Sequence, residues 1–133
     1  MISTPWFFVG IGGFLGAIFR YEIGGIIQNT SGFEFFPKGT LFVNVLGSLF
    51  LGFIFTLYQY DQIGQNALLL FGTGFSGAFT TFSTFALETA QLNQSHGLYQ
   101  SLTNIGVNVI FSLIGIFIGI IIGNFLLKNY LTS

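Results

Sequence analysis

Long apolar segments alternate with short polar connections along this chain, and they cover residues 5–29, 40–60, 67–92 and 99–127. Each segment reaches the length of about 20 residues that a helix needs to cross the hydrocarbon core of a bilayer. The first begins with Pro5 and Trp6, which are typical of a helix N-terminus and of a membrane interface. The pattern predicts an all-α integral membrane protein with four transmembrane helices in a single domain, residues 1–133.

The third segment contains a stretch that is unfavourable for a plain membrane helix. Residues 72–85 read Gly-Thr-Gly-Phe-Ser-Gly-Ala-Phe-Thr-Thr-Phe-Ser-Thr-Phe, so glycines and hydroxyl residues interrupt the apolar pattern. Such residues lower helix stability, and in lipid any freed backbone amide or carbonyl must find another partner. Transport proteins place ion sites at helix breaks near the bilayer midplane, where unwound carbonyls coordinate cations. The stretch predicts a break in the third helix and a small channel or transporter built around it.

Composition supports the membrane assignment and narrows the chemistry. Of 133 residues, 52% are hydrophobic and 5% are charged, whereas a soluble domain carries roughly a quarter charged residues. The formal net charge of -1 gives no indication of a nucleic-acid partner. The chain has no cysteine, and Glu88 is the only acid well inside an apolar segment, so no enzyme constellation is present. We therefore expect a protein that is not an enzyme.

Two polar side chains within apolar segments each allow two interpretations. An unpaired amide in lipid is costly, so Asn44 must point into the protein, as a hydrogen bond between helices, or into a pore. Arg20 lies about nine residues before the end of the first segment, roughly 13 Å at 1.5 Å per residue. Either the helix ends near Tyr21 and Arg20 meets headgroups, or Arg20 faces an aqueous vestibule that receives an anion.

A stripe of polar and then small residues follows one face of the fourth segment. At about 100° per residue, its members fall within a sector of roughly 100°: Asn104, Asn108, Ser112, Gly115, Gly119 and Gly123. The glycine half predicts a packing seam against another helix. The polar half predicts the wall of an aqueous or ion-lined path, with hydrogen bonds that merely bridge helices as the alternative.

Phe82 and Phe85 are three residues apart and therefore adjoin on one helix face. The edge of a phenylalanine ring carries partial positive charge, so both rings can present an edge to a small anion. Simple packing is the alternative for these two rings. Hydroxyl donors lie beside the rings at Thr80, Thr81, Ser83 and Thr84. Thr84 also shares a neighbouring face with Glu88.

Positive charge is balanced between the two sides that four spans would define. Lys38 and Lys128 would lie on opposite sides, and Arg20 leans weakly toward the side of Lys38. The excess of Lys and Arg that orients a membrane protein is then nearly absent. Such a chain can insert in both orientations, and two opposite copies would form an antiparallel homodimer whose pore elements come from both.

At this point the chain resembles a known family, the bacterial fluoride channels (Fluc, also called CrcB). The resemblance covers nearly the whole chain, and the Gly-x-x-Gly-x-x-Thr-Thr-Phe-Ser-Thr-Phe string is highly specific. The matching positions are Gly12, Gly13, Gly16, Ala17, Arg20, Tyr21, Gly39, Thr40, Leu41, Val43, Asn44, Gly47, residues 74–85, Asn104, Asn108 and Ser112.

The resemblance implies a dual-topology homodimer in the bacterial inner membrane, with two antiparallel pores that export fluoride passively and lower its toxic concentration in the cytoplasm. It implies a central structural sodium ion (Na+) bound by the backbone carbonyls of Gly77 and Thr80 from both subunits. It also implies roles for side chains: ring-edge ligands for Phe82 and Phe85, a pore amide for Asn44, a polar track for Asn104, Asn108 and Ser112, and vestibule or path roles for Arg20 and Glu88.

Two other functions fit part of the pattern. A small multidrug exporter is also a four-span, often dual-topology dimer, but proton exchange requires a carboxylate in the membrane, and the first segment has no acid before Glu22. A membrane scaffold without transport would be favoured if the glycines and amides served packing alone. Proton-coupled cation flux would support the exporter, and no flux of any ion would support the scaffold.

Overall fold

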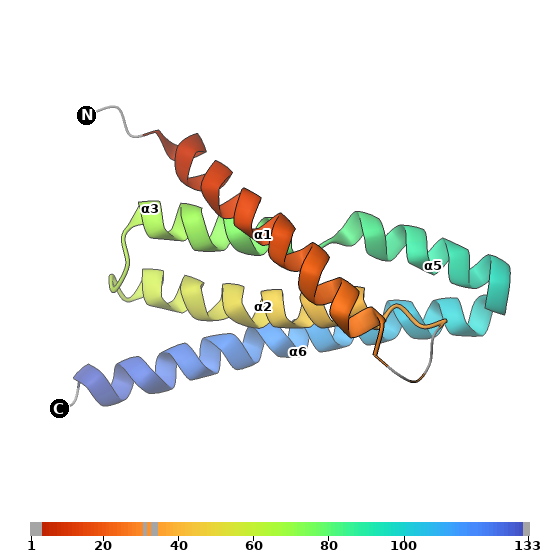
Figure 1. The fold of residues 1–133 in the computed structure, drawn as a ribbon. Coiled ribbons are helices and arrows are strands. Elements are labelled where there is room, and N and C mark those ends of the chain that lie inside the picture. Colours follow the sequence, from red (N-terminus) through yellow and green to blue (C-terminus); the bar gives the residue numbers. More distant parts are fainter. Residues whose placement is uncertain (1–3, 31, 33–34, 132–133) are drawn as a thin grey trace.

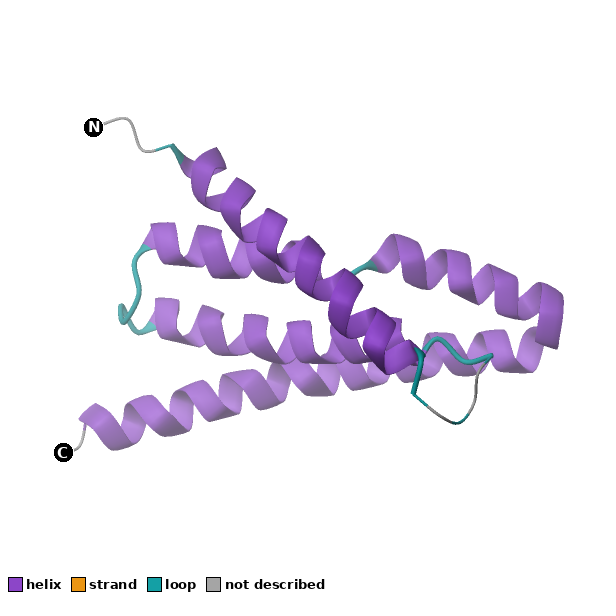
Figure 2. Cartoon of the chain, viewed as in Figure 1, coloured by secondary structure: helices purple, strands orange, loops and turns teal. Residues whose placement is uncertain are grey.

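The computed structural model describes residues 4–30, 32 and 35–131, and the regular secondary structure of these residues is helical (Figure 1; Figure 2). In chain order the elements are α1 (Pro5–Gln28), α2 (Lys38–Gln59), α3 (Gln65–Ala67), η1 (Leu68–Ser76), α4 (Gly77–Phe79), α5 (Phe82–His96) and α6 (Leu98–Leu131). Within the described residues, four helical stretches are long and apolar enough to cross a membrane: α1, α2, the run from α3 to α5, and α6. The chain is a multi-pass membrane protein.

The four spans pass back and forth between two ends of the molecule. In Figure 1 the start of α1 and the end of α6 lie at one end, together with the connection from α2 to α3. The connections from α1 to α2 and from α5 to α6 lie at the other end. Helix α1 crosses obliquely over η1 and α4, while α2 and α6 run alongside each other. This arrangement puts the middle of the third span at the centre of the molecule.

The helices overlap the four apolar segments but differ from them at several ends. Helix α1 ends at Gln28, one residue early, whereas α2 starts at Lys38, directly after Pro37 at its N-cap. Helix α5 continues four residues past the apolar segment to His96, because polar residues can extend a membrane helix into the interface. It stops at Gly97, whose φ of 88° few other residues adopt.

The third span changes backbone conformation twice. Its first part, η1, is a π-helix, and the Ser76 hydroxyl donates to the Phe71 carbonyl five residues earlier at 2.8 Å. One turn of α-helix, α4, follows. Thr80 (φ -83°, ψ 159°) and Thr81 (φ -151°, ψ 117°) are then extended, and α5 begins directly after them. The apolar pattern gave no sign of the π-helix, because it reports which residues are apolar and not how many of them make one turn.

Glycines let α1 contact the backbone of η1. A Cβ at Gly12 would overlap the carbonyl oxygen of Leu70, and one at Gly16 would overlap that of Phe75. From the other side, a Cβ at Gly74 would lie 2.6 Å from a carbonyl oxygen of α1. Small residues on both helices thus bring the two backbones together, as they do in many membrane proteins.

Helices α2 and α6 form a second glycine seam. A Cβ at Gly119 would overlap the carbonyl oxygen of Leu49, and a Cβ at Gly52 would overlap that of Ile116. Gly115 has the same function further along α6, where a Cβ would lie 2.8 Å from another carbonyl oxygen of α2. The packing seam predicted from the glycine half of the α6 stripe is confirmed.

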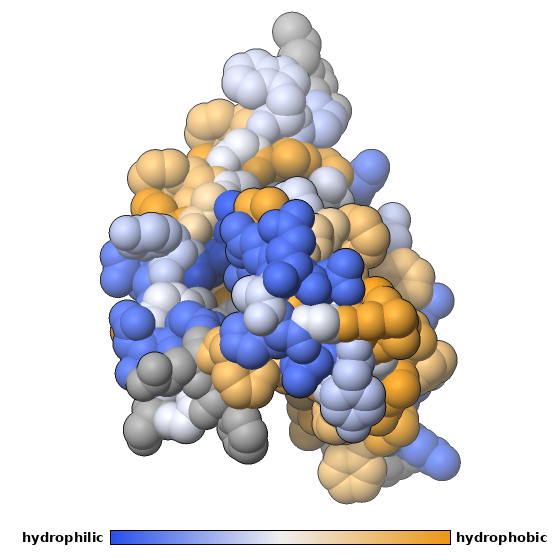
Figure 3. Space-filling view, turned by 90° about the vertical axis from the view of Figure 1, so that its right-hand side faces the viewer, coloured by the Kyte–Doolittle hydropathy of each residue, from blue (hydrophilic) through white to orange (hydrophobic). Residues whose placement is uncertain are grey.

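The interior of the described chain is unusually polar, while large apolar side chains cover its outside. Buried side chains with polar atoms include Thr40, Thr56, Ser76, Thr81, Ser101, Asn104 and Asn108. Such a distribution suits a lipid surround, because polar groups must find partners inside the protein. Figure 3 shows the end where α5 turns into α6, where hydrophilic residues gather between apolar flanks.

Candidate functional site

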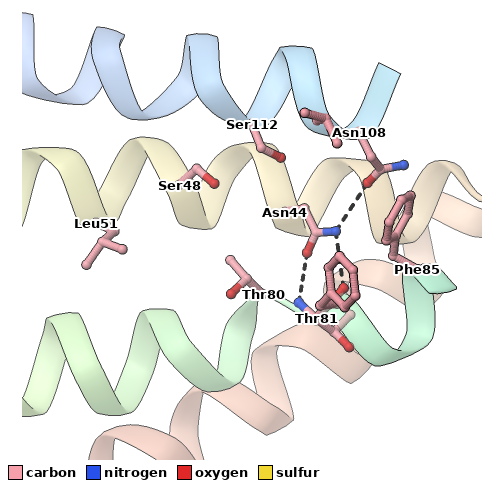
Figure 4. A pocket seen from close by; sticks show the side chains of 10 residues that line it. Asn44, Ser48, Leu51, Thr80, Thr81, Phe85, Asn108 and Ser112 are labelled. Carbon is pink, nitrogen blue, oxygen red and sulfur yellow. Dashed lines mark hydrogen bonds between the residues drawn. The ribbon is translucent and has the colours of Figure 1, made fainter. Parts of the chain in front are cut away.

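A pocket of about 250 Å³ opens beside the helix break, between α2, α5 and α6 (Figure 4). Its wall combines aromatic rings with amides and hydroxyls, from Asn44, Ser48, Thr80, Thr81, Phe82, Phe85, Asn108 and Ser112. Two apolar side chains, Leu51 and Val109, complete it. Among the described residues, no charged side chain lines this pocket. The site can therefore interact with an ion only through dipoles, ring edges and hydrogen bonds.

Asn44 holds the break through a paired contact with the peptide groups of Thr81. The Thr81 N–H donates to Oδ1 of Asn44 at 2.8 Å, and Nδ2 of Asn44 donates to the Thr81 carbonyl at 3.3 Å. The same Nδ2 donates to Oδ1 of Asn108 on α6 at 3.2 Å. The hydrogen bond between helices that the sequence left open for Asn44 is thus present. Its contact with an ion stays a prediction.

Two backbone carbonyls at the break lose the partners that a continuous α-helix would give them. The Gly77 carbonyl would accept from the Thr81 N–H, and the Thr80 carbonyl from the Thr84 N–H. The Thr81 N–H instead donates to Asn44, and the Thr84 N–H donates to Oγ1 of Thr81 at 3.2 Å. Released carbonyl oxygens at a helix break are the ligands that transport proteins use for Na+. The pair that the resemblance assigned to sodium therefore has suitable chemistry.

The two phenylalanines of the motif lie together on the wall of the pocket. Their ring centroids are 5.4 Å apart, and the planes are tilted by 58°. Phe85 is buried, with 7% of its surface exposed, whereas Phe82 is 77% exposed. One ring is therefore fixed by this chain, while the other lies on its outer surface. Their action as anion ligands stays a prediction.

The polar residues of α6 differ in their access to the pocket. Asn104 is fully buried, and its Nδ2 donates to Oγ1 of Thr89 on α5 at 2.8 Å. Asn108 is also buried but lines the pocket, and its Nδ2 donates to Oδ1 of Asn104 at 2.8 Å. Ser112 is half-buried and also lines the pocket. The structure thus brings Asn108 and Ser112 to the pocket and encloses Asn104 behind them.

A second pocket, of about 410 Å³, lies between α1, α2 and α5 and is lined by three of the four remaining predicted residues. Arg20, Thr84 and Glu88 line it together with Thr40. Thr40 donates to one carboxylate oxygen of Glu88 at 2.9 Å, and the other carboxylate oxygen is buried without a hydrogen-bond partner. Ser83 is exposed, and its Oγ lies 3.4 Å from Oγ1 of Thr81. The location of Arg20 agrees with the vestibule interpretation, whose role in ion passage stays a prediction.

Two residues of these sites were not identified as site residues from the sequence: Ser48 lines the first pocket and Thr40 the second. Thr81, expected only as a hydroxyl donor beside the rings, lines both pockets. A spacing signal was available, because Thr40, Asn44 and Ser48 follow one another at intervals of four on one face of α2. Thr81 also caps α5, since its hydroxyl accepts the Thr84 N–H.

Comparisons with known proteins agree with this architecture. The family model described as CrcB-like protein, Camphor Resistance (CrcB), matches residues 7–120. A protein of Methanosarcina acetivorans named fluoride-specific ion channel FluC 1 is 43% identical over 84% of this chain and 84% of its own length. A protein of Methanocaldococcus jannaschii named fluoride-specific ion channel FluC is 46% identical over 84% of this chain and 87% of its own length. Another of that name, from Thermosipho melanesiensis, is 40% identical over 86% of this chain and 92% of its own length. This chain therefore belongs to the CrcB family.

Proposed function

We propose that this protein is a fluoride-selective ion channel that lets fluoride leave the cytoplasm passively. The observation that carries the proposal is the uncharged pocket at the helix break, lined by phenylalanine rings, amides and hydroxyls. Relatives named as fluoride-specific channels over most of the chain support fluoride over the multidrug-exporter alternative. We place the protein in the plasma membrane of a bacterial cell, where export would reduce fluoride toxicity.

The chemistry of fluoride suits such a pocket. Fluoride is small, strongly hydrated and an avid hydrogen-bond acceptor, so a dehydrated path must replace its water with fixed donors. A lysine or arginine in the narrow part would hold the anion too tightly for rapid release. Phe82 and Phe85 offer polarised ring edges. Polar groups come from Asn44, Asn108 and Ser112 at the first pocket and Thr84 at the second, and the Ser83 hydroxyl lies 3.4 Å from that of Thr81, which lines both. Arg20 and Glu88 would act further out, at the second pocket.

A structural sodium ion would supply positive potential without a mobile side chain. The Gly77 and Thr80 carbonyls would bind it, because the N–H groups that would occupy them in a helix donate elsewhere. Gly77 is exposed, and a Cβ there would meet no atom of this chain within 4 Å, so the site is open to a second copy. A cation fixed by backbone oxygens can attract an anion along the pore without trapping it.

We further propose an antiparallel homodimer in which the two copies insert in opposite orientations. Phe82 lies on the surface of the single chain, and the pocket that it lines is open to the outside. A second copy related by a two-fold axis in the membrane plane would cover both and would bring a second Gly77 and Thr80 to the first pair. Each pore would then take wall elements from both copies.

Flux from liposomes tests the function directly. Purified protein is reconstituted, and fluoride efflux is recorded with an ion-selective electrode beside a chloride control. We expect rapid fluoride efflux, no chloride efflux and no dependence on a proton gradient. Proton-coupled cation flux without fluoride efflux would indicate an exporter instead, and absence of any flux would indicate a scaffold.

A further inference from the structure

A groove of about 340 Å³ lies between the end of α1, the first half of α2 and the middle of α6. One charged side chain, Lys38, lines this lateral groove, and its other lining side chains are apolar: Ile27, Leu41, Phe42, Val45, Val107 and Phe111. Its volume falls within the range of about 300–1,000 Å³ that is usual for small-molecule sites. A long apolar wall with a single cation suits a ligand that is itself apolar along most of its length.

The lateral groove and the helix break lie on different sides of the α2–α6 pair. Val45 and Val107 line the groove, and each is one position from an asparagine of the first pocket, Asn44 or Asn108. One residue turns an α-helix by about 100°, so the valines point away from that pocket. A second copy that covers the break in the proposed dimer would therefore leave the lateral groove in contact with lipid.

Lys38 places positive charge at one end of the groove. Its ammonium donates to the backbone carbonyls of Thr30 and Gly32, at 2.6 and 2.5 Å. These oxygens fix its position without neutralising it, and among the described residues the ammonium pairs with no carboxylate. Two of its three N–H bonds are used, so the third can donate to a ligand. Lys38 is also the first residue of α2, where the helix dipole disfavours a cation and an adjacent anion would offset the cost.

An anionic phospholipid fits this combination better than a second protein does. Lys38 lies at the end of the molecule that holds the connections from α1 to α2 and from α5 to α6 (Figure 1), so its ammonium reaches the depth of lipid headgroups. Cationic side chains at the ends of membrane spans attract anionic headgroups. A protein surface seated on the groove would instead bury the ammonium, which is costly unless an acid pairs with it.

We infer that the lateral groove binds one anionic phospholipid, whose phosphate accepts the third N–H of Lys38 and whose acyl chain lies along Phe42, Val45 and Val107. The inference concerns a different face from the proposed pore and does not depend on fluoride transport. In the proposed antiparallel dimer, the two copies would hold their lipids in opposite leaflets.

Tryptophan fluorescence in vesicles tests the site. The chain has a single tryptophan, so Trp6→Phe combined with Phe42→Trp gives a reporter protein whose only indole lines the groove. Lipids with brominated acyl chains quench a tryptophan that they contact. In phosphatidylcholine vesicles, half-maximal quenching should need about fivefold less brominated phosphatidylglycerol than brominated phosphatidylcholine, the preference expected for one lysine beside an anionic headgroup. Added salt should reduce this preference.

Four variants of the reporter protein separate charge from shape. Lys38→Gln keeps a donor for the two carbonyls and removes the charge, so the preference should fall to about one. Lys38→Arg keeps the charge and should retain the preference. Lys128→Gln, the matched control, removes the same charge at the other end of the spans and should retain it as well. Val107→Phe fills part of the groove and should reduce the preference by excluding the acyl chain. Gel filtration of each variant verifies that it remains folded.

Equal quenching by the two brominated lipids in the reporter protein would show ordinary surrounding lipid and would refute the site. A preference that survives Lys38→Gln, or one that Lys128→Gln removes equally, would refute the role of Lys38. A preference that Val107→Phe leaves unchanged would refute the seat of the acyl chain in the groove. None of these outcomes depends on whether the protein conducts fluoride.

Discussion

The amide of Asn44 substitutes for the backbone hydrogen bonds that a continuous helix would have made at Thr81. It accepts the Thr81 N–H at 2.8 Å and donates to the Thr81 carbonyl, so both polar groups of this residue are paired despite the extended conformation. A break in lipid would otherwise cost several kcal/mol for each unpaired group. The same contact leaves the Gly77 carbonyl without its helical donor. One side chain thus accounts for both the stability of the break and the chemistry proposed there.

Asn44→Leu should therefore affect both folding and passage of the anion. The Thr81 N–H and carbonyl lose their partner, which should lower the free energy of unfolding by about 1–3 kcal/mol for each buried group left unpaired. A loss of roughly 2 kcal/mol at the barrier would slow fluoride efflux about thirtyfold. Thermal unfolding in detergent and liposome efflux measure the two effects. Asn66→Leu, at an exposed amide on α3, is the control and should change neither.

The different burial of Phe82 and Phe85 predicts that their isoleucine variants will differ in stability but not in function. Isoleucine keeps an apolar side chain and removes the polarised ring edge, so both variants should conduct fluoride much more slowly. Phe85→Ile should also lower the free energy of unfolding by about 1–2 kcal/mol, because that ring is buried. Efflux and gel filtration are to be recorded together for each variant. Dimeric variants with the parent rate would show that the rings only pack.

The sequence identified most of the residues at the pocket and few of their partners. Asn44, Phe82, Phe85, Asn108 and Ser112 were found because polar or aromatic residues at helical spacing are conspicuous in apolar segments. Which amide bonds which backbone group depends on side-chain rotamers and on how three helices meet. Those features arise from tertiary packing, and periodicity carries no information about them.

At the level of whole helices, the apolar segments located the spans, and the glycines explained how closely they pack. The stripe on α6 predicted the seam with α2 correctly, because residues at intervals of four must share a face. The π-helix of η1 could not be predicted from the apolar pattern. A π-helix has more residues per turn than an α-helix, so it changes which face each later residue of the span occupies, and only contact with neighbouring helices fixes that register.

Two alanine variants on α6 test the seam with a matched control. Gly119→Ala would push a methyl group into the carbonyl oxygen of Leu49, so α2 and α6 must separate or shift. We expect a loss of about 1–3 kcal/mol in the free energy of unfolding, since overpacking of a tight interface costs that much. Gly106→Ala makes the same chemical change where a Cβ meets nothing within 4 Å, and it should be neutral or slightly stabilising. Equal unfolding temperatures for the two variants would contradict the seam.

On the scale of the whole molecule, the single chain encloses only part of its own site. Phe82 and Gly77 are exposed, and a Cβ at Gly77 would meet no atom of this chain within 4 Å. The small number of cations leaves orientation in the membrane undecided, since Lys38 and Lys128 stand at opposite ends of the spans. The exposed site leaves room for a second copy, and the balanced charge allows that copy to insert in the opposite orientation, as the proposed dimer requires.

Added positive charge should make each copy insert in one orientation only, and co-expression of two designs charged at opposite ends should supply both orientations again. Gln62→Arg with Gln65→Arg adds two positive charges at one end of the spans, and Asn93→Arg with Gln94→Arg adds two at the other. By the positive-inside rule, each double variant alone should insert in a single orientation. A cysteine added after Ser133 reports this in intact cells, because the chain has no other cysteine. The parent should be labelled from both sides in comparable amounts.

Each double variant alone would lack the opposite copy that the antiparallel pore requires, so cells that express either one should export no fluoride above background. Expression of both together supplies the two orientations again and should restore efflux to near the parent rate. This restoration distinguishes the antiparallel dimer from simple damage by the arginines, because damaged copies would not recover on mixing. A double variant that inserts in one orientation only, and still exports fluoride at the parent rate on its own, would rule out the antiparallel arrangement.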